Sequence, residues 1–400
     1  MRLEWLPNRV RSVGADRLVV GVVAVVGICL LVDLLLGLTV GRPSYGVFEV
    51  TTLLPISVPI SIPFVYPTIG DGTHSWESVW RYLRSGVVTG LILGLAGIGL
   101  SMTYSILKFA NFSHGDLVTA GAFSGWSVAL VVGGIGTADL STRILVRADR
   151  SVSPGELGIT VIETPLSVLV GLLGAVALTI LIALTIDRIV YKPMRTENAI
   201  ALLIASVGAA LALRYLINFV YTGQSRSVTP GNPAVSVFPV GPELTTVGAH
   251  TLTLVVTALA LMAGTHVLLQ YTKLGTAMRA MADNEDLALV TGIPTERVVN
   301  WTWIIGAGLT GAAGYLIVLQ RGTIHYNIGW ELLLLIFAAV ILGGIGSIYG
   351  AIGGGMIIGL AESMSNVWIP SDFALVVAFL LMIVVLLTKP EGLFGGVTTA

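Results

Sequence analysis

Charged side chains are scarce in this sequence. Aspartate, glutamate, lysine and arginine together make up 11% of the 400 residues, while apolar residues make up 55%. Soluble domains carry about 25% charged residues, which keep their surfaces wetted. Most of this chain therefore cannot face water. Its composition excludes a disordered chain, a collagen-like repeat and an ordinary soluble domain, and it indicates an integral membrane protein.

The chain also lacks the motifs of most enzymes and metal proteins. Its single cysteine, Cys29, has no partner within the chain, which excludes a disulfide scaffold. No lysine follows a glycine, as a Walker A nucleotide-binding loop requires. There is no G-x-S-x-G nucleophile elbow, and the histidines lack metal-ligand spacing. The net charge of −1 shows no excess of basic residues that would attract nucleic acid. We therefore expect no enzyme, and no metal, cofactor or nucleic acid bound.

Long apolar runs are what the sequence has in their place. About 20 apolar residues cross the hydrocarbon of a bilayer as a helix. By that measure the sequence predicts spans at 18–40, 86–108, 116–134, 165–187, 199–220, 250–270, 298–319, 350–368 and 372–388. Residues 331–343 form a shorter apolar stretch, which is either a further span or a re-entrant piece. The expected fold class is all-α, a polytopic transmembrane helical bundle of about 8–10 spans.

The basic residues between the spans predict the orientation. With the N-terminus inside, more lysines and arginines fall on the inner segments than on the longer outer ones. We therefore expect a multi-pass protein of the cell membrane with both termini cytoplasmic. The expected divisions are a cytoplasmic segment at 1–17, a first span at 18–40, an extracytoplasmic segment at 41–85, a transmembrane domain at 86–390 and a cytoplasmic tail at 391–400.

The segments between the spans differ in kind. Residues 41–85 contain spaced prolines, which forbid a continuous helix and predict an extended outer segment. Residues 135–164 and 222–249 are further outer loops. Residues 271–297, on the inner side, mix apolar and charged residues in a helical pattern and predict an amphipathic helix. Such a helix either docks a partner or rests on lipid headgroups, and periodicity alone leaves both open.

A short polar run between two predicted spans contains more than a turn needs. Gly115 is expected to end the first helix in the left-handed conformation, and Asp116 to cap the next helix. A tight helical hairpin explains these two residues. It does not explain the neighbouring polar side chains of Asn111, Ser113 and His114, which we expect to cluster at the inner membrane face.

Glycine is abundant, with 48 residues, many of them within the predicted spans. Pairs four residues apart, such as Gly90 with Gly94 and Gly355 with Gly359, predict close helix packing in lipid. One further group follows the short apolar stretch and predicts a helix break, a feature that transporters use at binding sites. This group consists of Gly343, Gly344, Gly346 and Ser347.

Four motifs in this chain resemble the branched-chain amino acid ABC transporter permeases of the LivH type. The first is the run GLILGLAGIGLSMTYSILKFANFSHGDLVTAGAF at residues 90–123, in which Asn111 to Gly115 resembles the family's N-F-A-H-G. The second comprises Thr272, Gly275, Arg279, Ala280, Asn284, Ala288, Gly292 and Ile293. The third is the glycine-rich run from Ala339 to Gly354, and the fourth is Pro390-Glu391-Gly392-Leu393-Phe394-Gly395.

The resemblance implies a system and a set of site residues. The chain would be the membrane subunit of an ABC importer for branched-chain amino acids, working with a sister permease of the LivM type, two cytoplasmic ABC ATPases and an extracytoplasmic solute-binding protein. The implied translocation-path residues are Asn111, Ser113, His114, Gly115, Gly343, Gly344, Gly346 and Ser347. The implied ATPase-coupling residues lie within 271–297, in a loop that partly matches the pattern E-A-A-x3-G. They are Arg279, Asp286, Leu287, Ala288 and Gly292. Ser113 stands where the family usually has alanine.

Three ionisable residues within predicted spans support a different mechanism. Asp33, Arg214 and Glu362 lie on separate spans, and an ion-coupled secondary transporter uses such groups. We expect Arg214 to extend to the outer water, and the two carboxylates to pair with neighbouring helices. Ion-coupled transport is therefore the second hypothesis for the mechanism, and a scaffold or receptor is the third. Urea and short-chain amides are alternative substrates, because permeases for them share the same motifs.

Overall fold

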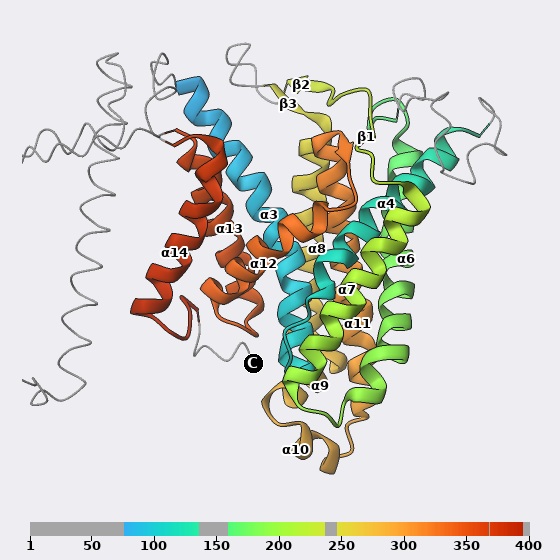
Figure 1. The fold of residues 1–400 in the computed structure, drawn as a ribbon, viewed down its shortest axis with the longest axis vertical. Helices are drawn as coiled ribbons and strands as arrows, with labels where there is room; N and C mark the ends of the chain where they lie inside the picture. The colour runs from blue at the N-terminus through green and yellow to red at the C-terminus, as the bar shows by residue number, and fades with distance from the viewer. Residues whose placement is uncertain (1–75, 136–158, 237–245, 368, 395–400) are drawn as a thin grey trace, which may run out of the picture.

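The computed structural model describes residues 76–135, 159–236, 246–367 and 369–394. The predicted first span at 18–40, with Cys29 and Asp33, and the spaced prolines of the outer segment lie outside these residues. The described part is a bundle of helices (Figure 1).

Seven described helices are long and apolar enough to cross a membrane. The first six contain α3 (Trp76–Leu107), α4 (Ser113–Gly133), α6 (Pro165–Ile186), α7 (Ala199–Tyr221), α8 (Ala249–Tyr271) and α11 (Thr295–Arg321). The seventh, Ser371–Thr388, joins the 3₁₀ turn η4 (Ser371–Phe373) to α14 (Ala374–Thr388). The third span extends α6 through a π-helical turn, η2 (Asp187–Tyr191), and a 3₁₀ turn, η3 (Lys192–Met194).

Two further helices lie in the region of the predicted short stretch and the span after it. They are α12 (Ile328–Gly343) and α13 (Ile348–Ser365). The first is apolar but has only 16 residues. The second forms where a span was expected, but it is not among the seven.

The prediction of an extended segment as far as residue 85 is wrong for its last ten residues. Helix α3 begins at Trp76 and is 32 residues long. The last proline before it is Pro67, and residues 76–85 contain neither proline nor glycine. Nothing in the local sequence therefore interrupts the helix.

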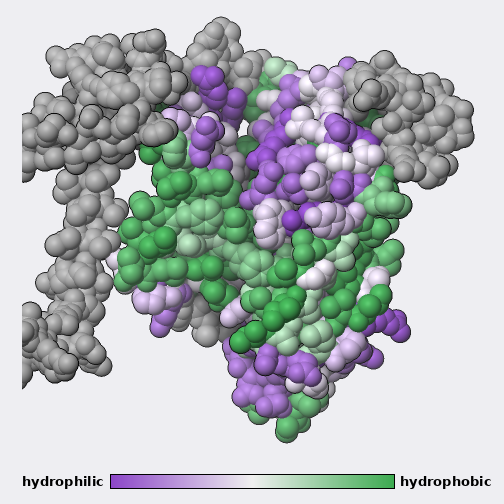
Figure 2. Space-filling view, viewed as in Figure 1, coloured by the Kyte–Doolittle hydropathy of each residue, from purple (hydrophilic) through white to green (hydrophobic). Residues whose placement is uncertain are grey.

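Helices α3 and α11 form the centre of the bundle. In each, 89% of the apolar window is buried, compared with 11% for the window of the seventh span. Close backbone contacts hold α3 against α13, because the glycines at 90 and 94 face those at 355 and 359. Figure 2 shows the outer surface as an apolar belt between hydrophilic ends. The belt is formed by exposed side chains of the peripheral helices, such as Leu181, Phe219 and Leu380.

Short antiparallel pairs of strands lie at one end of the bundle, opposite to α10 (Figure 1). Strand β1 (Arg226–Ser227) pairs with β4 (Thr323–Ile324), which connects the segment after α7 to the segment between α11 and α12. Strand β2 (Ala234–Ser236) pairs with β3 (Thr246–Gly248) just before α8.

Candidate functional site

The connection from α3 to α4 differs from the prediction. Gly115 does not end a helix, because it lies inside α4 and has no positive φ. The left-handed residue is Lys108, with φ 57°, directly after α3. Asp116 does not cap α4 either, since Phe112 occupies that position without a side-chain hydrogen bond. Gly115 serves close packing instead. A Cβ atom built there would lie 2.7 Å from the carbonyl oxygen of Gly329.

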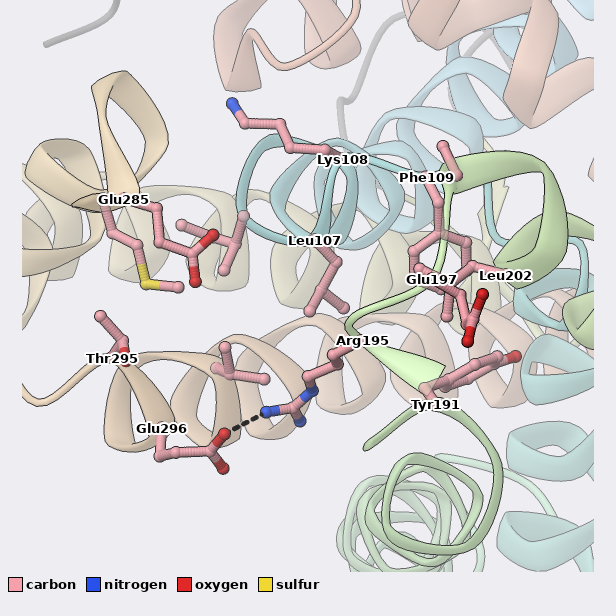
Figure 3. Close-up of a pocket in the computed structure, with 14 residues that line it drawn as sticks. Leu107, Lys108, Phe109, Tyr191, Arg195, Glu197, Leu202, Glu285, Thr295 and Glu296 are labelled. Carbon is pink, nitrogen blue, oxygen red and sulfur yellow. Dashed lines mark hydrogen bonds and ion pairs between the residues drawn. The ribbon is translucent and has the colours of Figure 1, made fainter. Parts of the chain in front are cut away.

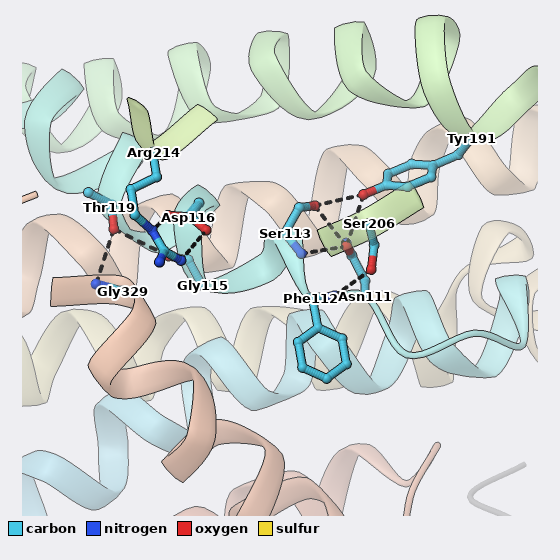
Figure 4. A network of polar contacts seen from close by, with 10 residues as sticks. All are labelled: Asn111, Phe112, Ser113, Gly115, Asp116, Thr119, Tyr191, Ser206, Arg214 and Gly329. Atoms are coloured by element: carbon cyan, nitrogen blue, oxygen red, sulfur yellow. Dashed lines mark hydrogen bonds and ion pairs between the residues drawn. The ribbon is translucent and has the colours of Figure 1, made fainter. Parts of the chain in front are cut away.

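Asn111 and Ser113 belong to a buried polar network at the start of α4 (Figure 4). The Asn111 Oδ1 atom accepts hydrogen bonds from the Ser113 backbone N–H at 3.0 Å and from its hydroxyl at 2.7 Å. The Tyr191 hydroxyl donates to the same oxygen at 3.1 Å and lies 2.8 Å from Ser113 Oγ. The predicted pair therefore shares one network with a tyrosine from η2. The sequence contains no motif that points to Tyr191.

His114 faces a different part of the bundle. Its Nε2 atom lies 2.9 Å from the carbonyl oxygen of Ala96 in α3 and 3.3 Å from Thr310 Oγ1 in α11. Because a carbonyl oxygen only accepts, Nε2 carries the proton. The His114 side chain thus joins the start of α4 to α3 and α11, and it makes no hydrogen bond to the Asn111 side chain.

Arg214 is buried, contrary to the prediction that it reaches the outer water. Its Nε and Nη2 atoms donate to the two carboxylate oxygens of Asp116 at 2.9 and 2.8 Å. The side chains are 10% and 0% exposed. The guanidinium also lies 4.4 Å from the ring centroid of Trp330 (Figure 4 draws the ion pair). A bidentate partner compensates the charge that would otherwise make burial unfavourable.

The start of α12 meets the start of α4 beside this ion pair. The Gly329 N–H donates to Thr119 Oγ1 at 3.0 Å, and the Gly115 and Gly329 backbones are in close contact. Trp330, the next residue of α12, covers Arg214. A single polar junction therefore lies inside the bundle. It consists of the starts of α4 and α12, the Arg214 guanidinium and the Asp116 carboxylate.

The predicted glycine-rich run begins at the last residue of α12 and continues to α13, where the helix is interrupted. Gly344 and Gly346 have φ values of 107° and 88°, which favour glycine. Ser347 then caps α13 by accepting the Gly350 N–H at 3.0 Å. The chain end closes this break, because Phe394 N–H donates to the Gly343 carbonyl at 3.0 Å. The glycine-rich run and the C-terminal motif thus form one structural unit.

Residues 271–297 form two helices, so the prediction of a single amphipathic helix is wrong. They are α9 (Lys273–Asp283) and α10 (Glu285–Val290). Asn284 is extended between them, with φ −155° and ψ 106°, and its Oδ1 atom accepts the Leu287 N–H at 2.9 Å as the cap of α10. An asparagine favours such a cap over the middle of a helix.

The predicted coupling residues divide between two faces of this helix pair. Leu287 is 61% exposed, and Asp286 and Gly292 are exposed as well. Ala288 is buried, and the Arg279 guanidinium donates to the Leu269 carbonyl of the same chain. The exposed face also carries Leu289 and Val290, the latter 84% exposed. An apolar surface at this polar end of the molecule is a feature of binding surfaces.

Metal binding has no support in the described part of the chain. No group of three or more histidine, cysteine, aspartate or glutamate side chains could hold an ion there.

Comparisons with known proteins agree on one family. A family model described as "Branched-chain amino acid transport system / permease component" matches residues 82–386. The "High-affinity branched-chain amino acid transport system permease protein LivH" of Salmonella typhimurium is 31% identical over 323 residues, 79% of this chain and 95% of the relative. Escherichia coli LivH is 32% identical over the same shares. Pseudomonas aeruginosa BraD, a protein of the same description, is 27% identical over 79% of this chain and 97% of its own length. No solved structure matches.

Proposed function

Because the chain belongs to the permease component family of branched-chain amino acid transport systems, we propose that it is the transmembrane permease subunit of an ATP-binding cassette importer for branched-chain amino acids. The observation that carries this proposal is the match to LivH proteins over 95% of their length. The matched region begins within α3 and ends within α14.

The helix interruptions supply the translocation path in this proposal. Irregular backbone within a membrane protein is tolerated where it is buried or lines a cavity. In the described transmembrane region, the helices are interrupted at Lys108–Phe112, before α4, and between α12 and α13. Polar side chains of Asn111 and Ser113 lie at the first. We assign to these two regions the residues along which the substrate passes.

The exposed part of α9 and α10 is the docking surface for the ATPases. The apolar side chains of Leu287, Leu289 and Val290 point away from the described chain. Gly292 follows with φ 85°, and no atom lies within 4 Å of where its Cβ would be. This surface is therefore open to a partner. Two cytoplasmic ABC ATPases, a sister permease of the LivM type and an extracytoplasmic solute-binding protein complete the proposed importer.

Reconstitution tests the function. The chain and its three kinds of partner, placed in proteoliposomes, should take up labelled leucine only with ATP on the cytoplasmic side. Excess isoleucine should reduce leucine uptake, and excess urea or acetamide should not. If only urea and acetamide reduce it, the chain is a urea or amide permease instead. Leucine uptake by this chain alone, driven by a proton or sodium gradient, would contradict the proposal.

Orientation has its own test. We place α9 and α10 in the cytoplasm, with both chain termini on that side of the cell membrane. Asp283 is exposed and caps no helix. A cysteine at this position, in a Cys29→Ser background, should react with an impermeant maleimide in inside-out vesicles and not in intact cells. Reaction in intact cells would show that the orientation is the reverse of the proposed one.

A further inference from the structure

A cavity of about 270 Å³ lies between the α9–α10 pair and the transmembrane core (Figure 3). Its walls come from the end of α3, the turns after α6, the start of α7 and the start of α11. Tyr191 contributes to the wall, and its hydroxyl belongs to the Asn111 network. The cavity therefore lies directly next to the polar start of α4. Its volume is just below the roughly 300 Å³ at which pockets for drug-sized ligands begin, so it suits a smaller molecule.

One part of the wall is apolar. It is formed by Ile106, Leu107, Phe109, Leu202, Met281 and Val299. These side chains come from α3, α7, α9 and α11 and from the segment after α3. An aliphatic group placed against them would be removed from water, which stabilises binding by about 25 cal/mol for each Å² of apolar surface.

Some of the charges at the cavity are already compensated. The Arg195 guanidinium pairs with Asp187 at 2.8 Å and with Glu296 at 2.7 Å. Glu296 also pairs with Lys192 at 2.9 Å. The charges of these four side chains compensate one another. They therefore stabilise the wall and offer little net charge to a ligand.

Three other charged side chains at the cavity have no ion-pair partner among the described residues. Two are the carboxylates of Glu197 and Glu285, and the third is the ammonium of Lys108. The Lys108 Nζ donates a single hydrogen bond, to the carbonyl of Ala282 at 2.7 Å. Since Ala282 is three residues before Glu285, the free cation and one free anion lie near the same helix junction. In Figure 3, Glu197 is drawn on the opposite side of the cavity.

We propose that this cavity binds an aliphatic α-amino acid that arrives from the cytoplasm. The choice of ligand class rests on the proposed function, because the transported product is released on that side. The ligand's ammonium pairs with Glu285, its carboxylate pairs with Lys108, and its aliphatic side chain packs against Leu107, Met281 and Val299.

Such a ligand connects elements that a transport cycle must move relative to one another. Glu285 is the first residue of α10, whereas Lys108 follows α3 and Val299 is in α11. An occupied cavity therefore fixes the ATPase-docking helices to the transmembrane core. Accumulated product slows its own import in this way.

Binding to the importer without its solute-binding protein tests the site directly. The permease, its sister subunit and the ATPases, purified together in nanodiscs, should bind labelled leucine saturably. Glu285→Gln and Lys108→Met should each weaken the affinity about tenfold, since each removes one charged contact. Asp283→Asn, which removes an exposed carboxylate outside the cavity, is the matched control and should bind as the wild type does. Isoamylamine and 4-methylpentanoate, which each lack one charged group of leucine, should compete poorly.

A second measurement connects the site to transport. In inside-out vesicles, leucine added at the cytoplasmic face should reduce ATP-driven transport by the wild type and much less by the Glu285→Gln variant. Each variant must still co-purify with the ATPases, which excludes misfolding as the cause. Equal leucine binding by Glu285→Gln, Asp283→Asn and wild type, or no binding at all, would overturn the site. Failure of the complex to transport leucine would instead count against the proposed function, whatever the cavity binds.

Discussion

Asp116 and Arg214 show what a single pair of residues adds to this bundle. They are separated by 98 positions in the chain, and their side chains meet with two hydrogen bonds inside the protein. The ion pair joins α4 to α7, and Trp330 extends it to α12. Removal of one partner leaves the other charge buried and unpaired, which is far less favourable than the loss of both.

Arg214→Leu should therefore destabilise the protein strongly, by about 3–5 kcal/mol, because the Asp116 carboxylate remains buried. The double variant Asp116→Leu with Arg214→Leu should recover much of that loss. Thermal unfolding of the purified protein in detergent measures both effects. If the single and double variants are equally unstable, the ion pair is not the cause.

A glycine at a helix crossing gives a second prediction at this scale. Gly115 faces the backbone of Gly329, which cannot move aside as a flexible side chain can. Gly115→Ala should lower the free energy of unfolding by about 1–3 kcal/mol through overpacking. Gly208→Ala in α7 is the matched control, because no atom lies within 4 Å of its Cβ position. That control should be neutral or slightly stabilising, and a similar loss in both variants would contradict the crossing.

At the scale of elements, sequence patterns located the spans better than their ends. Long apolar runs placed α6, α7, α8 and α11 within a few residues, because a helix needs about 20 mostly apolar residues to cross the hydrocarbon of a bilayer. The start of α3 and the break at Asn284 depend on capping and on local helix preference, which the apolar pattern does not contain. The break before α13 was predictable because several glycines follow the short apolar stretch, and two of them have positive φ in the structure.

The candidate site was predictable only in part, for a related reason. Asn111 and Ser113 were recognised from their own sequence neighbourhood, but Tyr191 is 78 positions from Ser113. Asp116 was interpreted as a local cap, although its partner lies in another helix. A short stretch of sequence predicts the local backbone. The contacts of Tyr191 and Asp116 depend instead on how helices that are distant in the sequence pack together.

The α9–α10 pair makes a prediction about ATPase binding. Gly292→Glu introduces a charge on the proposed docking surface, and any residue other than glycine is strained at φ 85°. Gly292→Ala, the control, introduces the strain without the charge. Co-purification with a tagged ATPase should fall at least about tenfold for Gly292→Glu and much less for Gly292→Ala. Equal recovery of the ATPase with both variants, together with normal uptake, would locate the docking surface elsewhere.

At the scale of the whole molecule, burial separates an inner set of helices from an outer set. The centres of α3 and α11 are enclosed by protein, while the outer faces of α6, α8 and α14 expose apolar side chains. Lipid and the proposed sister permease both suit these faces. The groups that we propose to line the substrate path lie toward the interior, at the start of α4 and at the connection between α12 and α13.

In the proposed importer, the energy for such movement comes from the ATPase subunits. No lysine follows a glycine in the sequence, so a Walker A loop is lacking. The α9–α10 pair connects the proposed docking surface to the core, since Lys108 after α3 donates to the Ala282 carbonyl of α9. A displacement of this pair by an ATPase thus reaches the connection between α3 and α4, where Asn111 and Ser113 lie.

The purified chain alone should consequently hydrolyse no ATP above the background of an empty-vector preparation. ATP hydrolysis should begin when the ATPase subunits are added, and it should be lost again when those subunits carry a substituted Walker A lysine. Phosphate release measured on the same preparations provides the comparison. Hydrolysis that persists in the isolated chain, after mass spectrometry has excluded ATPase contaminants, would mean that the chain contains its own nucleotide site. The proposal that separate ATPases drive this chain through its α9–α10 pair would then be wrong.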